Sequence, residues 1–257
     1  IELIANEAIR YKREVSKEQL FERTDTDLAD RRSLECLRYM YRLLFLFYIE
    51  ARPELGYAPI KADAYRKGYS LEWLRDIELV KLTSEESKNG TFLSDSLDQL
   101  FRLVYDGFQP REKGMRQLAL GTEGKPLHNT FQLTPLRTHL FDPKRTPTLS
   151  RVKVRNFVMQ RIIELMSLSR PAGRRERRGR VSYAQLGINQ LGAVYEALLS
   201  FSGFFAQTDL YEVKKAEEKA DELATAYFVP EDDLKEYTDE ERSEEHTSEL
   251  QSHLKLV

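Results

Sequence analysis

Apolar residues repeat at helical spacing most strongly between Leu34 and Ala51, in the stretch LECLRYMYRLLFLFYIEA. Six of them recur at steps of three and four, which places them on one face of a helix: Leu34, Leu37, Tyr41, Leu44, Phe45 and Tyr48. From Leu43 onward, apolar residues also occupy the other faces. A helix that is apolar all round is typical of the centre of a domain. We therefore predict that the helix of residues 34–51 is buried and that the fold is organised around it.

A membrane span is the alternative interpretation of this helix. Such a span needs about 20 predominantly apolar residues. Arg38, Arg42 and Glu50 bracket a much shorter apolar run in this sequence. We therefore predict a core helix and no membrane partner.

Weaker helical patterns occur on both sides of the central helix. We expect them to form further helices within residues 1–22, 70–80, 93–108, 156–169 and 184–201. Ser70 and Asn156 are good N-cap residues, because a side-chain oxygen there can accept a hydrogen bond from a backbone N–H of the first turn. Gly107 is suited to end a helix, because glycine tolerates the left-handed backbone found at many helix C-termini.

Two other regions interrupt the helical pattern. Residues 109–150 are rich in Gly and Pro, which break long elements, so we expect a loop-rich insertion there. Further along, LYEVKKA (residues 210–216) and TAYFVPEDD (residues 225–233) are typical of two strands of a hairpin separated by a charged connector. The predicted fold class is mainly α, a helical domain with a loop-rich insertion and a small β-hairpin near the natural C-terminal end.

These patterns also divide the chain into parts. We expect an N-terminal helical region at 1–112 around the helix 34–51, a loop-rich excursion with a second helical region at 113–206, and a charged β-hairpin junction at 207–241. The last part, residues 242–257, begins with RSEEHTSELQSH, which one reading frame of a short-read sequencing adapter encodes. We therefore expect a tail that is not native and that contributes nothing to folding, and a natural gene that continues past Glu241.

The composition is that of a soluble, mostly helical protein. Of the 257 residues, 41% are hydrophobic and 32% are charged. Cys36 is the single cysteine, which excludes a disulfide framework. We therefore expect a reducing, cytoplasmic compartment.

Charge is unevenly distributed along the chain. Residues 1–208 hold 34 Lys/Arg and 26 Asp/Glu, a net charge of +8, whereas residues 209–257 hold 6 and 16, a net charge of −10. The basic part includes an arginine run, RPAGRRERRGR, at 170–180. Arginine forks match phosphate oxygens, so these side chains are candidate DNA contacts: Arg174, Arg175, Arg177, Arg178 and Arg180. The alternative is a solvated loop.

Several other polar residues favour structural roles. Arg38 and Arg42, with Glu35 and Glu50, are expected to form pairs within the helix or between helices rather than to act in catalysis. Cys36 is expected to be a core residue rather than a nucleophile.

Motifs for phosphate or metal binding are incomplete. Residues 121–125, GTEGK, lack the spacing of a phosphate-binding loop, and Pro126 stands where that motif has Ser or Thr. His128 and His139 lack a second pair of ligands at metal spacing, so loop or packing roles are expected. Taken alone, these residues predict no catalytic machinery and no metal site.

Two stretches carry a resemblance to a known family, and a segment between them matches it in position. LRYMYRLLFLFYIEARPELGYAP (residues 37–59) and SYAQLGINQLGAVYEALLSFSGFFA (residues 182–206) resemble two helical segments of large prokaryotic DNA methyltransferases. Between them, LRTHLFDPKRTPTL (residues 136–149) matches the position of the family's Asn-Gly-Gly-Leu-Phe segment, with Arg-Thr-His in place of Asn-Gly-Gly. The family comprises class I, S-adenosylmethionine-dependent adenine methyltransferases of fused type II restriction-modification enzymes and of phage-defence systems of the DISARM and BREX kind. The most specific part of the match is Gly192–Glu196.

The resemblance implies a place in a larger enzyme. In that family this helical region precedes a Rossmann-like catalytic domain with an F-x-G-x-G loop for S-adenosylmethionine and an N-P-P-Y motif for a flipped adenine. Neither motif is present in this sequence, and we expect both further along the natural gene. The parent would methylate adenine N6 with S-adenosylmethionine as cofactor, bind DNA, and work with other restriction or defence subunits.

The resemblance also suggests roles for single residues. Gly192 would allow a close approach of helices, and Tyr195 and Glu196 would order the junction with the catalytic domain; ordinary helix packing with a surface Glu is the alternative. A different class of function also stays open for the chain, a non-enzymatic helical scaffold whose charged faces bind protein.

Overall fold

The computed structural model describes most of the chain with gaps: residues 1–17, 26–77, 80–110, 131–169 and 178–200, and the short segments 203–205, 210–213, 227–230, 232–236 and 254–256. The fold is mainly α, as predicted. Its α-helices are α1 (Glu2–Glu14), α2 (Thr26–Glu50), α3 (Asp63–Gly68), α4 (Leu71–Asp76), α5 (Glu85–Asn89), α6 (Phe92–Asp106), α8 (Asn156–Ser167) and α9 (Ile188–Ser200). Short 3-10 helices occupy Pro53–Leu55, Pro143–Arg145, Tyr183–Gln185 and Asp233–Glu236.

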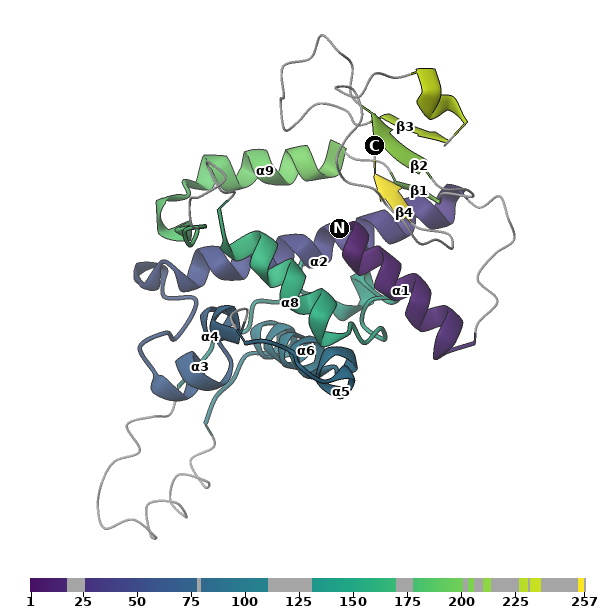
Figure 1. Cartoon of the computed structure of the whole chain (residues 1–257). Helices are drawn as coiled ribbons and strands as arrows, with labels where there is room; N and C mark the ends of the chain where they lie inside the picture. Colours follow the sequence, from purple (N-terminus) through teal and green to yellow (C-terminus); the bar gives the residue numbers. More distant parts are fainter. Residues whose placement is uncertain are drawn as a thin grey trace, which may run out of the picture.

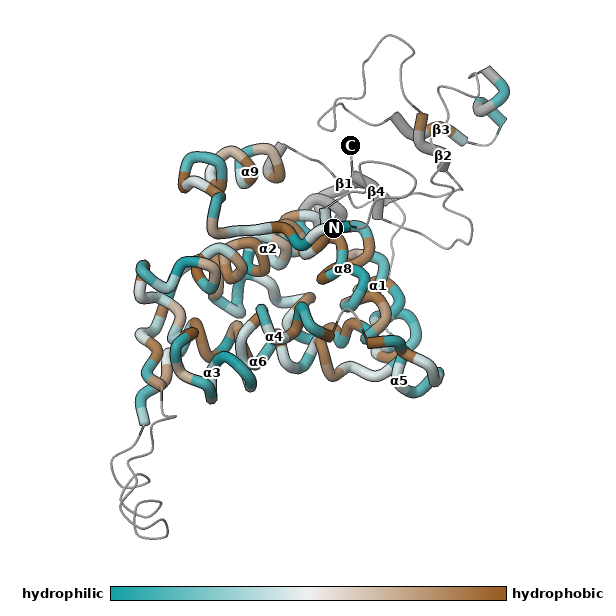
Figure 2. Tube along the Cα trace, turned by 60° about the vertical axis from the view of Figure 1, so that its left-hand side comes forward, coloured by the Kyte–Doolittle hydropathy of each residue, from teal (hydrophilic) through white to brown (hydrophobic). Residues whose placement is uncertain are grey.

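Helix α2 is the centre of the fold. Figure 1 shows α9 on one side of it, α3, α4 and α6 on the other, and α1 and α8 crossing it. The view of Figure 2 again places α9 on the side of α2 opposite α3 and α6. Leu43 and Leu46 are fully buried and Phe47 is nearly so. The predicted central helix is therefore confirmed, although it begins at Thr26 rather than Leu34.

The most buried face of α2 differs from the predicted one. Leu34, placed at the start of the apolar stripe, is 40% exposed, and Tyr41 is only half-buried. Cys36 and Tyr39 are buried instead, because their face packs against α1 and α6. Tyr39, for example, contacts the ring of Phe101 in α6 edge to face, with centroids 5.2 Å apart. Leu37, Leu44 and Tyr48 of the predicted stripe are buried as well, whereas Tyr41 packs against Tyr195 of α9 and stays partly exposed.

Two predicted helix ends are confirmed and one is corrected. The Ser70 hydroxyl accepts a hydrogen bond from the backbone N–H of Trp73 at the start of α4. Gly107 ends α6 with a φ of 74°. Asn156, however, is the first residue of α8, and the N-cap is Arg155. The Asn156 side chain accepts from the backbone N–H of Leu93 instead, so it holds the start of α6.

The loop-rich insertion is confirmed within residues 131–155, where the only helix described is the 3-10 turn of Pro143–Arg145. This segment returns to the core, because Phe131, Leu133 and Phe141 are buried in it. Residues 111–130, including the candidate phosphate loop and His128, lie outside the described residues.

Two antiparallel ladders lie near the end of the chain. Strands β2 (Leu210–Val213) and β3 (Tyr227–Pro230) pair with Leu210 opposite Pro230, which confirms the predicted hairpin. Strand β1 (Gly203–Phe205) pairs with β4 (Leu254–Leu256). This second ladder gives the tail from Arg242 onward a packing contact that the sequence did not predict, because β4 also touches α1 and α2.

Candidate functional site

The main candidate site is an open cleft between α2, α9 and the loop that follows the buried strand-like segment at 131–133. Its volume is about 340 Å3. The lining residues are Arg38, Tyr41, His139, Leu140, Arg145 and Tyr195. We refer to it below as the α2–α9 cleft. Among its described lining residues, three can carry positive charge and none is acidic.

Two arginines of α2 position the loop wall of this cleft. Arg42 is buried, and its Nε and Nη2 donate to the backbone carbonyls of Leu140 and Asp142 at 2.6 and 3.1 Å. Arg38 Nη1 donates to the carbonyl of Arg145 at 3.1 Å. The loop is therefore held through its backbone, and the side chains of His139, Leu140 and Arg145 line the cleft.

The side chains of the loop wall are themselves connected. One guanidinium nitrogen of Arg145 lies 3.3 Å from Nδ1 of His139. Because an arginine has no acceptor, this contact is a hydrogen bond when Nδ1 of His139 is unprotonated. Arg145 and His139 are both exposed, so this pair of side chains can be reached from solvent.

Two aromatic rings also line the cleft. Tyr41 of α2 and Tyr195 of α9 contact each other with ring centroids 4.5 Å apart and an interplanar angle of 46°. Burial, together with the neighbouring Tyr195, raises the pKa of the Tyr41 hydroxyl, which keeps it neutral. Tyr195 is 38% exposed, so part of its ring surface is open to solvent.

The expected ion pairs of α2 are replaced by contacts with backbone. Glu35 accepts hydrogen bonds from the backbone N–H groups of Thr148 and Leu149 at 2.9 and 3.0 Å. Glu50 accepts from the backbone N–H groups of Leu71 and Glu72. Their contacts agree with a structural role, but the partners are main-chain groups and, for Glu50, the Tyr65 hydroxyl, rather than the arginines of the same helix.

The arginine run does not join the α2–α9 cleft within the described residues. Arg178 pairs with Glu164 of α8 at 2.9 Å, and Arg180 pairs with Asp76 of α4 at 2.8 Å. Arg174, Arg175 and Arg177 lie outside the described residues. Both described arginines are therefore paired with a carboxylate that offsets their charge.

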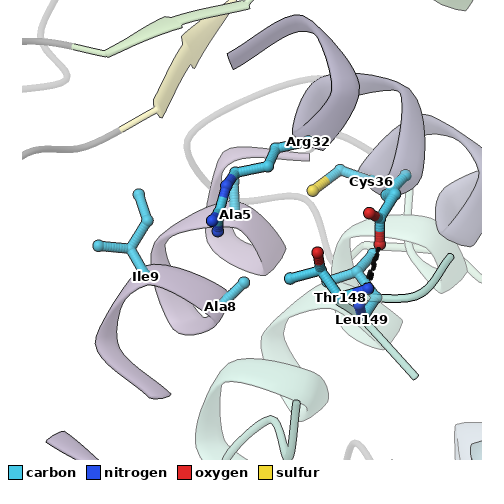
Figure 3. Close-up of a pocket in the computed structure, with 8 residues that line it drawn as sticks. Ala5, Ala8, Ile9, Arg32, Cys36, Thr148 and Leu149 are labelled. Carbon is cyan, nitrogen blue, oxygen red and sulfur yellow. Dashed lines mark hydrogen bonds between the residues drawn. The ribbon is translucent and has the colours of Figure 1, made fainter. Parts of the chain in front are cut away.

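Cys36 lines a second, much smaller cavity with Ala5, Ala8 and Arg32, shown in Figure 3. Its volume of about 10 Å3 holds one water molecule at most. Burial raises the pKa of the Cys36 thiol to about 12, so the sulfur is neutral at physiological pH. Because the thiolate is the reactive form, the geometry supports the predicted core role.

Two further findings bear on what the chain can bind. In the part of the chain that the structure describes, no group of three or more His, Cys, Asp or Glu is arranged to hold a metal ion. Across the same residues, every helix is too short or too polar to cross a membrane.

Gly192 does not mark a close approach of helices. A Cβ atom built at this position meets no described heavy atom within 4 Å. Within the described part of the chain, the close approach of helices expected at this glycine is not seen. Tyr195, three residues later, is the residue of this segment that makes the contact with α2.

Most residues of the α2–α9 cleft were not predicted as a site. Arg38 was assigned to ion pairs and His139 to packing, whereas Tyr41 was placed in the apolar stripe. The sequence offered only an indirect signal for this site. Its lining residues fall in the two stretches that resemble the methyltransferase family or in the segment 136–149 between them.

Comparisons of the chain with protein-family models, curated proteins and solved structures find no match.

Proposed function

We propose that this chain is the DNA-engaging helical region of an S-adenosylmethionine-dependent DNA adenine-N6 methyltransferase of a prokaryotic restriction or phage-defence system. One observation carries the proposal. The two stretches that resemble this family and the segment 136–149, which matches the family in position, meet at the α2–α9 cleft and supply all of its described lining residues. A region that holds nucleic acid beside a catalytic domain would need a cationic cleft of this kind.

The chemistry of the cleft supports a phosphate-bearing partner. Guanidinium groups bind phosphate oxygens through paired N–H donors. Nη1 of Arg38 donates a hydrogen bond to the carbonyl of Arg145, which uses one of the five N–H donors of the guanidinium. The remaining donors of Arg38, together with Arg145, can therefore reach an anion while the loop stays anchored. Such contacts position DNA without reading its sequence.

The parent enzyme would divide the work between two regions. S-adenosylmethionine would bind the catalytic domain and supply the methyl group there. The residues of this chain would hold the DNA backbone, in the cytoplasm, beside other restriction or defence subunits. The arginine run at 170–180 is a second candidate contact, and ranks behind the cleft because Arg178 and Arg180 are engaged by carboxylates.

The test measures DNA affinity against salt for the full chain, by fluorescence anisotropy with single-stranded and duplex oligonucleotides. The variant Arg38→Gln/Arg145→Gln should reduce the log–log slope by about 0.7–0.9 for each lost phosphate contact. The control, Arg66→Gln/Lys67→Gln, removes the same charge from α3, on the other side of α2.

Two results would overturn the proposal. One is an equal slope for the cleft variant and the unmodified chain. The other is an absence of DNA affinity together with salt-insensitive binding of a protein, which is the behaviour of the alternative scaffold function.

A further inference from the structure

We infer that the α2–α9 cleft takes an unpaired nucleotide, with its base against Tyr195 and its phosphate against Arg38 and Arg145. This inference rests on the proposed function and names the form of DNA that the site accepts. The ligand is a nucleotide within a DNA strand whose base is not stacked on its neighbours. A single strand and an extruded base in a duplex both supply it.

The aromatic wall provides the base contact. The contact with Tyr41 fixes Tyr195 from one side, with centroids 4.5 Å apart. The solvent-exposed part of the Tyr195 ring then offers an immobilised platform, so little side-chain entropy is lost when a base stacks on it. Stacking on an aromatic side chain tolerates every base, because each base has a π-face.

The cationic wall provides the phosphate contact. Arg38 and Arg145 are joined through a backbone carbonyl, and Arg145 is joined to His139. Both guanidinium groups line the cleft together with the two tyrosines. A row of cations beside an aromatic platform is the arrangement that proteins use for single-stranded nucleic acid.

The shape of the site excludes a paired duplex from the same space. A duplex keeps its bases stacked inside and is read by elements that project into its grooves. The α2–α9 cleft is concave, and its 340 Å3 lies near the lower end of the range of about 300–1,000 Å3 for sites that hold small molecules. It therefore fits one nucleotide that has been taken out of the stack.

The experiment compares three oligonucleotides on the full chain: a single strand, a fully paired duplex, and the same duplex with one bulged nucleotide. We expect the single strand and the bulged duplex to bind more tightly than the paired duplex. Tyr195→Ala should weaken binding of these two by about fivefold or more, because one stacked base is lost. Tyr195→Phe should keep the affinity, because the ring remains, and it serves as the folding control.

Tyr57→Ala is the matched control, because Tyr57 is an exposed tyrosine outside the cleft. If the bulged duplex gains affinity and the single strand does not, the source of the nucleotide is an extruded base; the opposite result identifies a single strand. Equal affinity for all three forms, or a Tyr195→Ala variant that binds like the unmodified chain, would overturn the inference. The proposed function would survive that outcome if Arg38→Gln/Arg145→Gln still lowered the salt slope.

Discussion

Tyr65 of α3 donates a hydrogen bond of 2.8 Å to the carboxylate of Glu50 at the end of α2. The same carboxylate accepts the backbone N–H groups of Leu71 and Glu72, so it caps α4 from another helix. Glu50 is 6% exposed and Tyr65 is fully buried. One acidic side chain thus joins three helices, α2, α3 and α4, at the side of the core away from α9.

Glu50 should make the stability of the protein fall with rising pH. Burial raises its pKa from 4.5 to about 7, against the opposing effect of its three hydrogen bonds. Between these pH values the folded state binds more protons than the unfolded state, so the contribution is complete below pH 4.5 and is lost as pH rises through 7. The loss is at most about 3 kcal/mol. Urea unfolding at pH 5 and pH 8 should show a smaller decline for Glu50→Gln, whereas exposed Glu85→Gln should follow the unmodified chain.

Glu7 should stabilise the fold in the opposite pH direction. Its side chain is buried and pairs with Arg10 and Arg155, so it ties α1 to the start of α8. Burial alone would raise its pKa, but the hydrogen bonds from Arg155 and Arg10 outweigh burial and lower it. The stabilisation is therefore present above the unfolded pKa of 4.5 and is lost as pH falls through the folded pKa.

Removing the interhelical partner tests this pair. Arg155→Met should cost about 2–3 kcal/mol in urea unfolding at pH 7, because the Glu7 charge stays buried with fewer donors. Glu14→Gln, which removes the exposed partner of Arg10, should cost at most about 0.5 kcal/mol. Equal effects of the two substitutions would contradict the assigned role of Glu7.

Two glycines should respond oppositely to alanine. Gly107 has a φ of 74°, and a Cβ there would lie 2.7 Å from the backbone nitrogen of Pro135. Gly107→Ala should therefore destabilise the fold by about 1–3 kcal/mol. Gly192 lies within α9 with space around it, so Gly192→Ala should stabilise by about 0.5–1 kcal/mol through helix propensity. Thermal midpoints measure both, and a stabilising Gly107→Ala would refute the backbone argument.

Deleting residues 242–257 tests the interpretation of the tail. The deletion removes β4, which pairs with β1 over three residues. β4 also touches α1 and α2, but it contributes only three residues, and short two-stranded ladders are marginally stable in water, so we expect the thermal midpoint to stay unchanged. A fall of several degrees would contradict the interpretation of this segment as a non-native tail.

The sequence predicted features that depend on local pattern. The buried centre of α2 follows from apolar density around Leu43, and the ends at Ser70 and Gly107 follow from the chemistry of single residues. The partners of Glu35 and Arg42 could not be predicted, because they are backbone groups about 100 residues away. Their geometry exists only after the chain has folded.

The same reason explains why the α2–α9 cleft was missed. Arg38 and Tyr195 carry no local signal of a common site, and they meet only because α9 packs along α2. The family resemblance pointed to the segments that line the cleft, but it gave no sign that they meet at one site. The arginine run at 170–180 is the more conspicuous feature of the sequence. In the structure, however, its described members Arg178 and Arg180 pair with Glu164 and Asp76.

Photo-crosslinking tests DNA engagement at the cleft most directly. The full chain is irradiated with a single-stranded oligonucleotide that carries a photoreactive base, and the crosslinked peptide is identified by mass spectrometry. We predict crosslinks at Tyr195 or Tyr41 that disappear in Arg38→Gln/Arg145→Gln and persist in Arg66→Gln/Lys67→Gln. Crosslinks confined to the arginine run at 170–180, or no crosslink at all, would contradict the account.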